Sequence, residues 1–299
     1  METKIVALAN QKGGCGKTTT AVSLAAGFAH QGYSVSIVDL DPQCNATDSF
    51  GVDRDELARA GRFTTADIFL GKKSAANVEI VFPQRFRGEL GLVPGHRGLT
   101  SVPQRLESAL QAQLANEDSA ELDADDLKNE HRERLKQSLN SLRGRRDVVF
   151  IDTPPDLGFL VTTALIAADF FIIPVFPSGY DLKGLETLMR TVEKVQKRFN
   201  PNLQLLGVLL GNYDITAKLD SDIHNMLSRK FGKGLIFDVK ISRSVKHREA
   251  TVYGRTIVEH APEQQAAAQF LALVKEVAAR LNGTAPPARE SLMGVADHG

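Results

Sequence analysis

The stretch ANQKGGCGKTTTAV, residues 9–22, decides the fold of this chain. Residues 16–18 complete the phosphate-loop pattern G-x-x-x-x-G-K-[ST], but the place of its first glycine holds Gln11, and Lys12 adds a second lysine. The stretch follows a strand-like run at 4–10 and opens a helical run. In this setting glycines let backbone amides approach phosphate oxygens, a lysine reaches the β- and γ-phosphates, and a threonine hydroxyl joins Mg²⁺. The stretch therefore predicts binding of ATP or GTP with Mg²⁺.

The residues of this loop form the first candidate site. We expect Lys17 to contact the phosphates and the Thr18 hydroxyl to reach the metal ion. The nucleotide contacts expected from the loop as a whole come from Lys12, Gly13, Gly14, Cys15, Gly16, Lys17, Thr18 and Thr19. Because the ordinary pattern has no place for Lys12, the role of this residue needs a separate explanation.

Short apolar runs alternate with helical patterns along the chain. Several of these runs are apolar at consecutive positions, which is typical of strands that are covered on both faces. They predict an α/β fold, a mostly parallel, doubly wound sheet with helices on both faces. The expected strands are 4–10, 34–41, 88–95, 147–154, 170–177, 203–211 and 235–241.

Helical spacing marks three further regions. Spaced leucines predict a helical pair within about 101–144, inserted outside the sheet. Further helices are expected at 182–199 and at the C-terminal end, where Gly283 closes the last one. Residues 284–299 are predicted to be a disordered tail. We therefore expect a single P-loop domain over 1–283, with the helical pair as an addition to its surface.

The charges cancel overall but are unevenly distributed. Lys and Arg together number 36, as do Asp and Glu. Residues 117–133 hold eight acidic side chains and two basic ones, whereas 229–255 hold eight basic and two acidic ones. No apolar run approaches the roughly 20 residues of a membrane-spanning helix, no secretory signal is visible, and Cys15 and Cys44 are too few for a disulfide framework. These features predict a cytoplasmic protein that does not bind membranes.

Two further segments end expected strands in aspartates. IVDLDPQCNAT carries Asp39 and Asp41, and VVFIDTPPDLG carries Asp152. Ligands gather at the carboxyl ends of strands in open α/β sheets. An aspartate there can hold Mg²⁺ or orient an attacking water, because phosphoryl transfer depends on positioning and charge neutralisation. Asp41 and Asp152 are thus predicted as catalytic and metal-binding residues, whereas a structural cap stays open for Asp39.

Three motifs, taken in order, resemble those of a known family. KGGCGKTT, DLDPQCNAT and IDTPPDLG look like the deviant Walker A, switch I and Walker B segments of ParA/Soj-type partition ATPases, in the group that includes MinD and the nitrogenase iron protein. The resemblance continues through VFPSGYDLKGLETLMRTVEKVQKRFNPNLQLLGVLLGNYD and ISRSVKHREATVYGRTIVEHAP. It covers most of the chain outside about 100–144 and the tail.

The resemblance implies a role for each matching residue. Lys12 would reach across a dimer interface to the nucleotide of the partner, while Lys17 would act on the phosphates of its own protomer. Asp41 would position the hydrolytic water, and Asp152 would lie near Mg²⁺. Proteins of this family form an ATP-dependent sandwich homodimer that binds DNA without sequence preference, and a ParB-type partner stimulates their slow hydrolysis. The resemblance therefore implies association with the nucleoid.

The base of the nucleotide and the DNA would be held by later segments. The segments GNYD and ISRS match the region that holds adenine in the family, which implies contacts from Asn212 and Ser242. Lys246 and Arg248 are predicted to contact DNA, because sequence-independent binding depends on neutralising phosphates. A solvated charged face is the alternative interpretation of these basic residues. Further candidates for DNA contacts are Lys197, Arg229 and Lys230.

Three alternatives stay open beside a partition ATPase. A MinD-like ATPase would need a membrane-binding amphipathic helix, but the apolar stripe from Phe270 to Leu281 is expected to pack on the sheet. An iron–sulfur protein would need cysteine ligands away from the phosphates, whereas Cys15 lies in the loop and Cys44 follows Asp41 closely. A ParA-like ATPase could also position another cargo, such as a protein array or a conjugative element.

Overall fold

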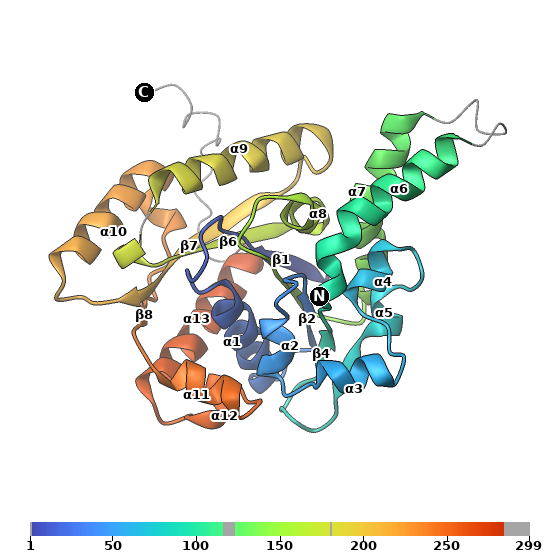
Figure 1. Cartoon of the computed structure of the whole chain (residues 1–299). Helices are drawn as coiled ribbons and strands as arrows, with labels where there is room; N and C mark the ends of the chain where they lie inside the picture. The colour runs from blue at the N-terminus through green and yellow to red at the C-terminus, as the bar shows by residue number, and fades with distance from the viewer. Residues whose placement is uncertain (1, 116–122, 180, 284–299) are drawn as a thin grey trace.

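A single sheet lies at the centre of the structure, a computed structural model that describes residues 2–115, 123–179 and 181–283 (Figure 1). Its strands in these ranges are β1 (Lys4–Leu8), β2 (Val35–Asp39), β3 (Ile80–Phe82), β4 (Leu90–Val93), β5 (Val148–Asp152), β6 (Phe170–Val175), β7 (Gln204–Tyr213) and β8 (Ile241–Ser242). Their order across the sheet is β3-β4-β2-β5-β1-β6-β7-β8. Neighbouring strands are parallel, except that β3 runs antiparallel to β4.

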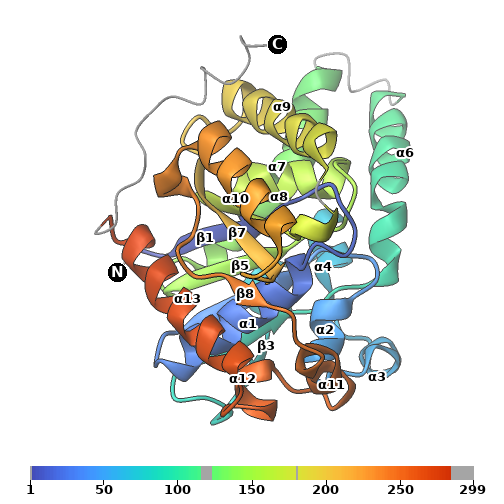
Figure 2. The same ribbon diagram turned by 90° about the vertical axis from the view of Figure 1, so that its left-hand side faces the viewer.

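Helices connect the strands and cover both faces of the sheet. Their bounds are α1 (Lys17–His30), α2 (Asn45–Ser49), α3 (Arg54–Arg59), α4 (Thr65–Phe69), α5 (Ala75–Val78), α6 (Val102–Leu114), α7 (Ala124–Leu139), α8 (Phe159–Ala167), α9 (Leu182–Arg198), α10 (Lys218–Phe231), α11 (Lys246–Val252), α12 (Ile257–His260) and α13 (Gln265–Leu281). Figures 1 and 2 show α1 and α13 on one face and α7, α8 and α9 on the other. The predicted doubly wound α/β fold is confirmed.

Two hydrophobic clusters, one on each face, hold the layers together. Phe28 of α1 and Phe270 of α13 are buried with Phe150 of β5. On the other face, Leu139 of α7 and Leu188 of α9 are buried in a separate cluster. Burying a large apolar side chain contributes about 1.5–3 kcal/mol relative to leaving it exposed. The central strands are covered on both sides, which explains their uninterrupted apolar runs.

The register of the central strands brings the aspartates to one edge. Asp39, the last residue of β2, lies opposite Asp152, the last residue of β5. Leu8, the last residue of β1, lies opposite Asp152 on the other side. The chain leaves β1 at this edge and enters the phosphate loop. The sheet therefore gathers the loop and the aspartate segments at its carboxyl end, as expected.

The expected strand at 235–241 is wrong for most of its length, since only Ile241–Ser242 forms a strand. The segment is apolar and largely buried, but its backbone groups pair with side chains of α13. Arg280 Nη2 donates to the Ile236 carbonyl over 3.0 Å. Two further amides of the segment donate to the Glu276 carboxylate, each over 3.0 Å. Beside β7 the segment forms only an isolated bridge, in which Ile236 pairs with Val208 and the Phe237 amide donates to the Val208 carbonyl over 3.0 Å. Side chains of α13 take the backbone groups on either side, so the pairing does not continue as a strand.

The helical pair expected within about 101–144 is present as α6 and α7, and residues 116–122 between them lie outside the described part. Leu135 and Leu139 of α7 are fully buried in the cluster that α8 also joins. Figure 1 shows the outer ends of both helices extending beyond the sheet. The tail predicted at 284–299 lies outside the described residues as well. The inner half of α7 thus forms part of the core.

The C-terminal helix packs as predicted. The apolar stripe of α13 from Phe270 to Leu281 is buried against the sheet and α1. Within the described ranges, none of the helices combines the length and the apolar character that crossing a membrane requires.

Candidate nucleotide site

The phosphate loop joins the end of β1 to the start of α1 through backbone shapes that favour glycine. Gly14 has a φ of 72°, and Gly16, which caps α1, has a φ of 89°. A Cβ atom on Gly16 would lie 2.8 Å from the ring of Phe176, which follows β6. Gly16 is therefore required both by its left-handed conformation and by the close approach of an aromatic ring. The resulting loop directs backbone amides toward the N-terminus of α1, the usual place for a phosphate.

The two lysines of the loop occupy different environments. Lys17 is only 6% exposed, and its Nζ donates to the Lys12 carbonyl over 3.1 Å. The Lys12 side chain is exposed, and its backbone amide donates to Asn10 Oδ1 over 3.0 Å. Asn10 is itself held by a hydrogen bond of 2.6 Å to the Pro174 carbonyl. Lys17 is thus placed inside the site of its own protomer, whereas Lys12 lies at the surface.

Asp152 is the most unusual carboxylate of the site. Both of its oxygens are buried without a hydrogen-bond partner. Burial and the neighbouring charge of Asp39 raise the pKa of Asp152 well above its ordinary value, while Thr18 and Lys17 act in the opposite direction. A buried carboxylate without donors is costly unless a cation compensates it. Asp152 and the Thr18 hydroxyl therefore fit a divalent metal ion.

The donor set around this position suits Mg²⁺ in particular. In the described part of the chain, no group of three His, Cys, Asp or Glu side chains could hold a metal ion. Mg²⁺ is usually bound by one or two carboxylates, with phosphate oxygens and waters completing the octahedron. The Asp152 carboxylate and the Thr18 hydroxyl provide oxygen ligands beside the phosphate loop, so phosphate oxygens and waters can complete the coordination of Mg²⁺.

Asp39 serves the architecture of the site. It accepts hydrogen bonds from the Thr47 amide at 2.8 Å, the Thr47 hydroxyl at 2.7 Å and the Asp41 amide at 3.1 Å. The Thr47 hydroxyl also accepts a hydrogen bond from the Gly95 amide at 2.9 Å. Burial raises the pKa of Asp39 to about 6. Asp39 therefore fixes α2 to the sheet, which is the structural alternative that the sequence leaves open for it.

Asp41 is placed where its carboxylate can act on a ligand. It is 7% exposed, and its Oδ1 accepts a hydrogen bond from the Gln43 amide over 2.9 Å. Its charge raises the pKa values of both Asp39 and Asp152, so the three carboxylates lie near one another. Asp39 ends β2 and Asp41 lies in the turn after it, so the two carboxylates accept hydrogen bonds from different partners.

A pocket of about 300 Å³ adjoins the end of the loop. Its lining includes Gly16 and Thr19 together with Asn212 and Ser242, the two predicted adenine contacts. The Ser242 hydroxyl is already hydrogen-bonded to Gln269 Oε1 over 2.9 Å. The segments GNYD and ISRS predict only Asn212 and Ser242, and the rest of the polar and aromatic lining comes from side chains that the sequence does not single out for this pocket. This further lining includes Phe176, Arg243, His247 and Phe270.

Both cysteines are buried thiols. Burial raises the pKa of Cys15, which lies inside the loop. Burial also raises the pKa of Cys44 to about 12. Both side chains are thus buried and packed, as predicted.

Comparison with known proteins identifies the family. A profile of the AAA domain family matches residues 3–205. The sporulation initiation inhibitor protein Soj of Bacillus subtilis is 33% identical over 276 residues, which cover 92% of this chain and 98% of that protein. The chain belongs to the ParA/Soj family. The resemblance seen in the sequence motifs is thereby confirmed.

Two further similarities bear on this ParA/Soj-family chain. The chromosome-partitioning ATPase Soj of Thermus thermophilus is 35% identical over 276 residues, 92% of this chain and 96% of that protein. Among solved structures, cobyrinic acid a,c-diamide synthase from Mycobacterium smegmatis has been determined with a bound ATP analogue and magnesium. It superposes with a TM-score of 0.74 at 27% identity, covering 95% of this chain and 98% of that one.

The basic residues predicted to contact DNA divide into two groups. Lys246 and Arg248 lie together on α11, where Lys246 Nζ pairs with Glu249 Oε2 over 2.7 Å. Lys230 of α10 pairs with Glu186 of α9 over 3.1 Å. Figures 1 and 2 show α9 and α10 on the opposite face of the sheet from α11. The α10 candidates Arg229 and Lys230 and the α9 candidate Lys197 therefore lie apart from Lys246 and Arg248 within one protomer.

The segment after Asp41 touches the segment that carries these basic residues. The backbones of Gly51 and Gly254 approach so closely that a Cβ on Gly254 would lie 2.6 Å from the Gly51 Cα. Arg85 spans the same junction, donating to the Phe50 and Gly254 carbonyls, each over 2.8 Å, and to the Glu259 carboxylate. The end of α2 and the α11–α12 region are thus joined directly. The motifs do not predict this contact, because it joins segments that lie far apart in the sequence.

Asp152→Asn is expected to stabilise the ligand-free protein at neutral pH. Because the folded-state pKa of Asp152 is raised, the free energy of unfolding falls as pH rises from the unfolded pKa, about 3.9, through the folded pKa. The neutral amide of the asparagine side chain does not ionise, so the substitution Asp152→Asn removes this loss of stability. Thermal melts without nucleotide should therefore show a melting temperature that exceeds the wild-type value by a few degrees near neutral pH, with the gap closing in acid. The exposed Asp156→Asn should show no gap, and an Asp152→Asn protein less stable than wild type at pH 7 would contradict the assignment.

Proposed function

We propose that this ParA/Soj-family chain hydrolyses ATP with Mg²⁺ to segregate a plasmid or chromosome. The observation that carries the proposal is the buried, unpartnered Asp152 carboxylate beside Thr18 and Lys17 at a phosphate loop. Support comes from the relative in T. thermophilus, a chromosome-partitioning ATPase, and from the M. smegmatis structure with an ATP analogue and magnesium. One domain, spanning 1–283, would carry the whole site.

The loop and its lysine bind the phosphates in this proposal. Amides at 13–16, directed by the two left-handed glycines, donate to phosphate oxygens. Lys17 exchanges the Lys12 carbonyl for the β- and γ-phosphates. Asn212 and Ser242 border the pocket that takes the base. Gly16 belongs both to the loop and to the lining of this pocket, so the two parts of the site adjoin.

The carboxylates perform the catalytic part of the work. Thr18 and Asp152 would hold Mg²⁺, which would neutralise charge on the phosphates. Asp41 accepts a hydrogen bond from the attacking water and aligns it with the phosphorus atom. Asp39 keeps α2, and with it the Asp41 turn, in place. Residues at the carboxyl edge of the sheet thus promote hydrolysis by positioning the reactants and by neutralising charge.

Lys12 links hydrolysis to dimerisation. Its exposed side chain leaves the loop at the molecular surface, so a second protomer placed face to face would receive it at the phosphates of its own nucleotide. A homodimer with two nucleotides between its subunits follows. Hydrolysis by the isolated protomer is slow because a cation of the site is missing until the partner arrives.

In this scheme the dimer binds DNA and is regulated by a partner protein. The contact between α2 and the α11–α12 region connects the nucleotide site to Lys246 and Arg248. ATP-bound dimers bind DNA without sequence preference and so associate with the nucleoid. A ParB-type activator accelerates hydrolysis and releases the dimer from DNA.

Binding to DNA and to membranes distinguishes the proposal from a MinD-like ATPase. The protein with ATP, ADP or no nucleotide should be tested against a random-sequence duplex and against anionic liposomes. We expect retention on the duplex with ATP alone, weakened by salt because phosphate contacts release counterions. Retention on liposomes without duplex binding would favour the MinD-like alternative. A ParA-like ATPase for another cargo would bind DNA as well, and only a co-purified partner would separate it from a partition protein.

Lys246→Gln is expected to weaken DNA binding without changing ATP binding. Lys246 is on α11 and outside the lining of the base pocket, unlike Arg248, which lines it. Loss of one phosphate contact per protomer should lower the slope of log K against log salt by about 1 per protomer. Anisotropy titrations of a labelled duplex at several salt concentrations measure this slope. Lys275→Gln on α13 is the matched control, and equal slopes for both variants would place the DNA contacts elsewhere.

A further inference from the structure

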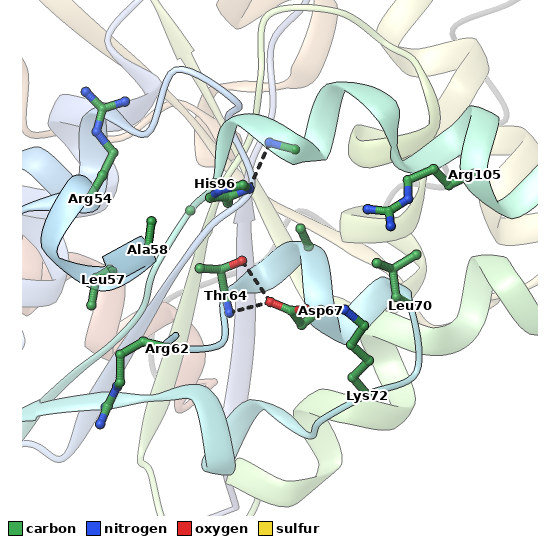
Figure 3. Close-up of a pocket in the computed structure, with 13 residues that line it drawn as sticks. Arg54, Leu57, Ala58, Arg62, Thr64, Asp67, Leu70, Lys72, His96 and Arg105 are labelled. Carbon is green, nitrogen blue, oxygen red and sulfur yellow. Dashed lines mark hydrogen bonds and ion pairs between the residues drawn. The ribbon is translucent and has the colours of Figure 1, made fainter. Parts of the chain in front are cut away.

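A second pocket lies between α3, α4 and the start of α6, and none of its lining residues belongs to the phosphate loop. Figure 3 shows Thr64 and Asp67 between its two sides, with Arg105 reaching in from α6. Leu57 and Ala58 of α3 lie on the opposite side (Figure 3). The Asp67 carboxylate is held by the Thr64 amide over 3.0 Å and by the Thr64 hydroxyl over 3.3 Å. These hydrogen bonds make the floor of the pocket a fixed surface.

Positive charge dominates the lining of this pocket. Its cationic side chains are Arg54, Arg62, Lys72 and Arg105, against the single carboxylate of Asp67. Lys72 Nζ satisfies that carboxylate over 3.0 Å. Among the described residues, neither Arg62 nor Arg105 has an ion-pair partner, and both are exposed. The pocket therefore presents two guanidinium groups to a negatively charged ligand.

The size and the apolar lining of the pocket restrict that ligand. Its volume is about 130 Å³, whereas sites for cofactors and drug-sized molecules measure roughly 300–1,000 Å³. Leu57, Ala58 and Leu70 supply apolar surface, which a phosphate group would leave unused. A ligand with a single apolar side chain between carboxylates matches both the small volume and the apolar lining of the pocket. A DNA duplex fits this pocket less well than a peptide, because the phosphates of DNA lie on a convex backbone and do not enter a recess.

We infer that this pocket binds an acidic peptide segment of a partner protein, with one apolar side chain in the recess. The apolar side chain contacts Leu57, Ala58 and Leu70. Carboxylates on either side of it pair with Arg62 and Arg105, and guanidinium groups suit such pairing because they bind carboxylates with two parallel hydrogen bonds. Charge complementarity and the small recess together specify the partner chemistry.

Binding at this pocket reaches the nucleotide site through Arg54. Its Nη1 donates to the Gln43 carbonyl over 3.1 Å, and its Nε pairs with Asp48 of α2 over 2.9 Å. Gln43 in turn donates its amide to the Asp41 carboxylate over 2.9 Å. Arg54 also lines the pocket, so a peptide carboxylate that competes with Asp48 for Arg54 would alter the turn that carries Asp41. This consequence rests on the proposed ATPase function, whereas the binding itself does not.

Rhodamine-labelled peptides test the binding directly on the full chain by fluorescence anisotropy. The probes are EDLDE, the uncharged analogue NQLNQ, and EDGDE, which lacks the apolar side chain. We expect EDLDE to bind at least about tenfold more tightly than either analogue. Arg62→Glu combined with Arg105→Glu should weaken EDLDE binding by about tenfold or more. Ala58→Trp fills the recess without changing charge and should weaken it as well, while Arg59→Glu on the same helix α3 is the control and should not.

Each result decides the matter. Equal binding of EDLDE to the wild type and to the doubly substituted protein would overturn the assignment, as would equal binding of EDLDE and EDGDE, which would indicate a general anion patch. Competition by a random-sequence duplex that Ala58→Trp does not affect would reassign the basic residues to DNA. ATP hydrolysis measured with saturating EDLDE tests the link through Arg54, and an unchanged rate would refute that link. A protein that binds EDLDE but hydrolyses no ATP would instead refute the proposed ATPase function.

Discussion

Lys12→Ala is expected to lower the rate of ATP hydrolysis at least about 100-fold, the usual effect of removing one charge-stabilising group from a transition state. ATP binding should be retained, because Lys17 and the loop amides that contact the nucleotide of the same protomer are unchanged. The loop itself should keep its shape, since Lys12 is attached to it through its backbone: the amide donates to Asn10 and the carbonyl accepts from Lys17. Alanine preserves both contacts. The expected loss therefore reports on the side chain alone.

Two measurements check this prediction. A fluorescent ATP analogue gives the affinity, and phosphate release at saturating ATP gives the rate. Gln11→Ala is the matched control, because it is the exposed neighbour of Lys12 in the same loop. Lys17→Ala should differ from both by losing nucleotide affinity. Hydrolysis at the wild-type rate in Lys12→Ala would disprove a role for this lysine in the transition state.

The sequence predicts the fold well where a strand is buried on both faces. The runs that become β1, β2, β5 and β6 are apolar at consecutive positions, and each lies in the sheet as expected. The run at 235–241 is also mostly apolar, but it meets β7 only through an isolated bridge at Ile236, while Arg280 and Glu276 bind its other backbone groups. Periodicity reports burial, and it cannot distinguish a neighbouring strand from side chains that occupy the same hydrogen-bonding positions.

The candidate site shows a similar division. The loop motif predicts glycines that let the backbone approach the phosphates and a lysine that contacts them, and the structure adds that Gly14 and Gly16 are left-handed and that Lys17 is buried. Asp39 and Asp41 are two residues apart and have the same side chain, so only the structure shows that Asp39 accepts from Thr47 and thereby fixes α2. Phe176 and the pocket of Arg54 and Arg105 depend on contacts between distant segments, which carry no local pattern.

Asp41→Ala is expected to hold the protein as an ATP-bound dimer that hydrolyses ATP at least about 100-fold more slowly than the wild type. Asp41 orients the attacking water in the proposed mechanism, whereas nucleotide and metal binding depend on Lys17, Thr18 and Asp152. Sedimentation velocity with and without ATP measures the oligomeric state. A monomer at saturating ATP would refute the sandwich dimer. Asp39→Ala is the informative comparison, because it removes the acceptor of the Thr47 hydrogen bonds and should lower the melting temperature, which Asp41→Ala should not.

Mixing the two inactive variants separates action within a protomer from action across the dimer. In a heterodimer of Lys12→Ala and Asp41→Ala, one nucleotide site combines the intact Asp41 of the first protomer with the intact Lys12 of the second. If Lys12 acts on the partner's nucleotide, that site is complete, and an equimolar mixture should recover roughly a quarter of the wild-type rate, since half of randomly assorted dimers are mixed and each has one working site. If Lys12 acts on its own nucleotide, every site in the mixture lacks one group and no activity returns. A mixture of Lys12→Ala with Lys17→Ala serves as a control. If Lys12 acts on the partner's nucleotide, this mixture recovers activity as well, provided that the Lys17→Ala protomer can enter the dimer without a nucleotide of its own. Recovery in the first mixture would assign the extra lysine of the loop to the opposite subunit, and its absence would require a role for Lys12 at the phosphates that its own loop binds.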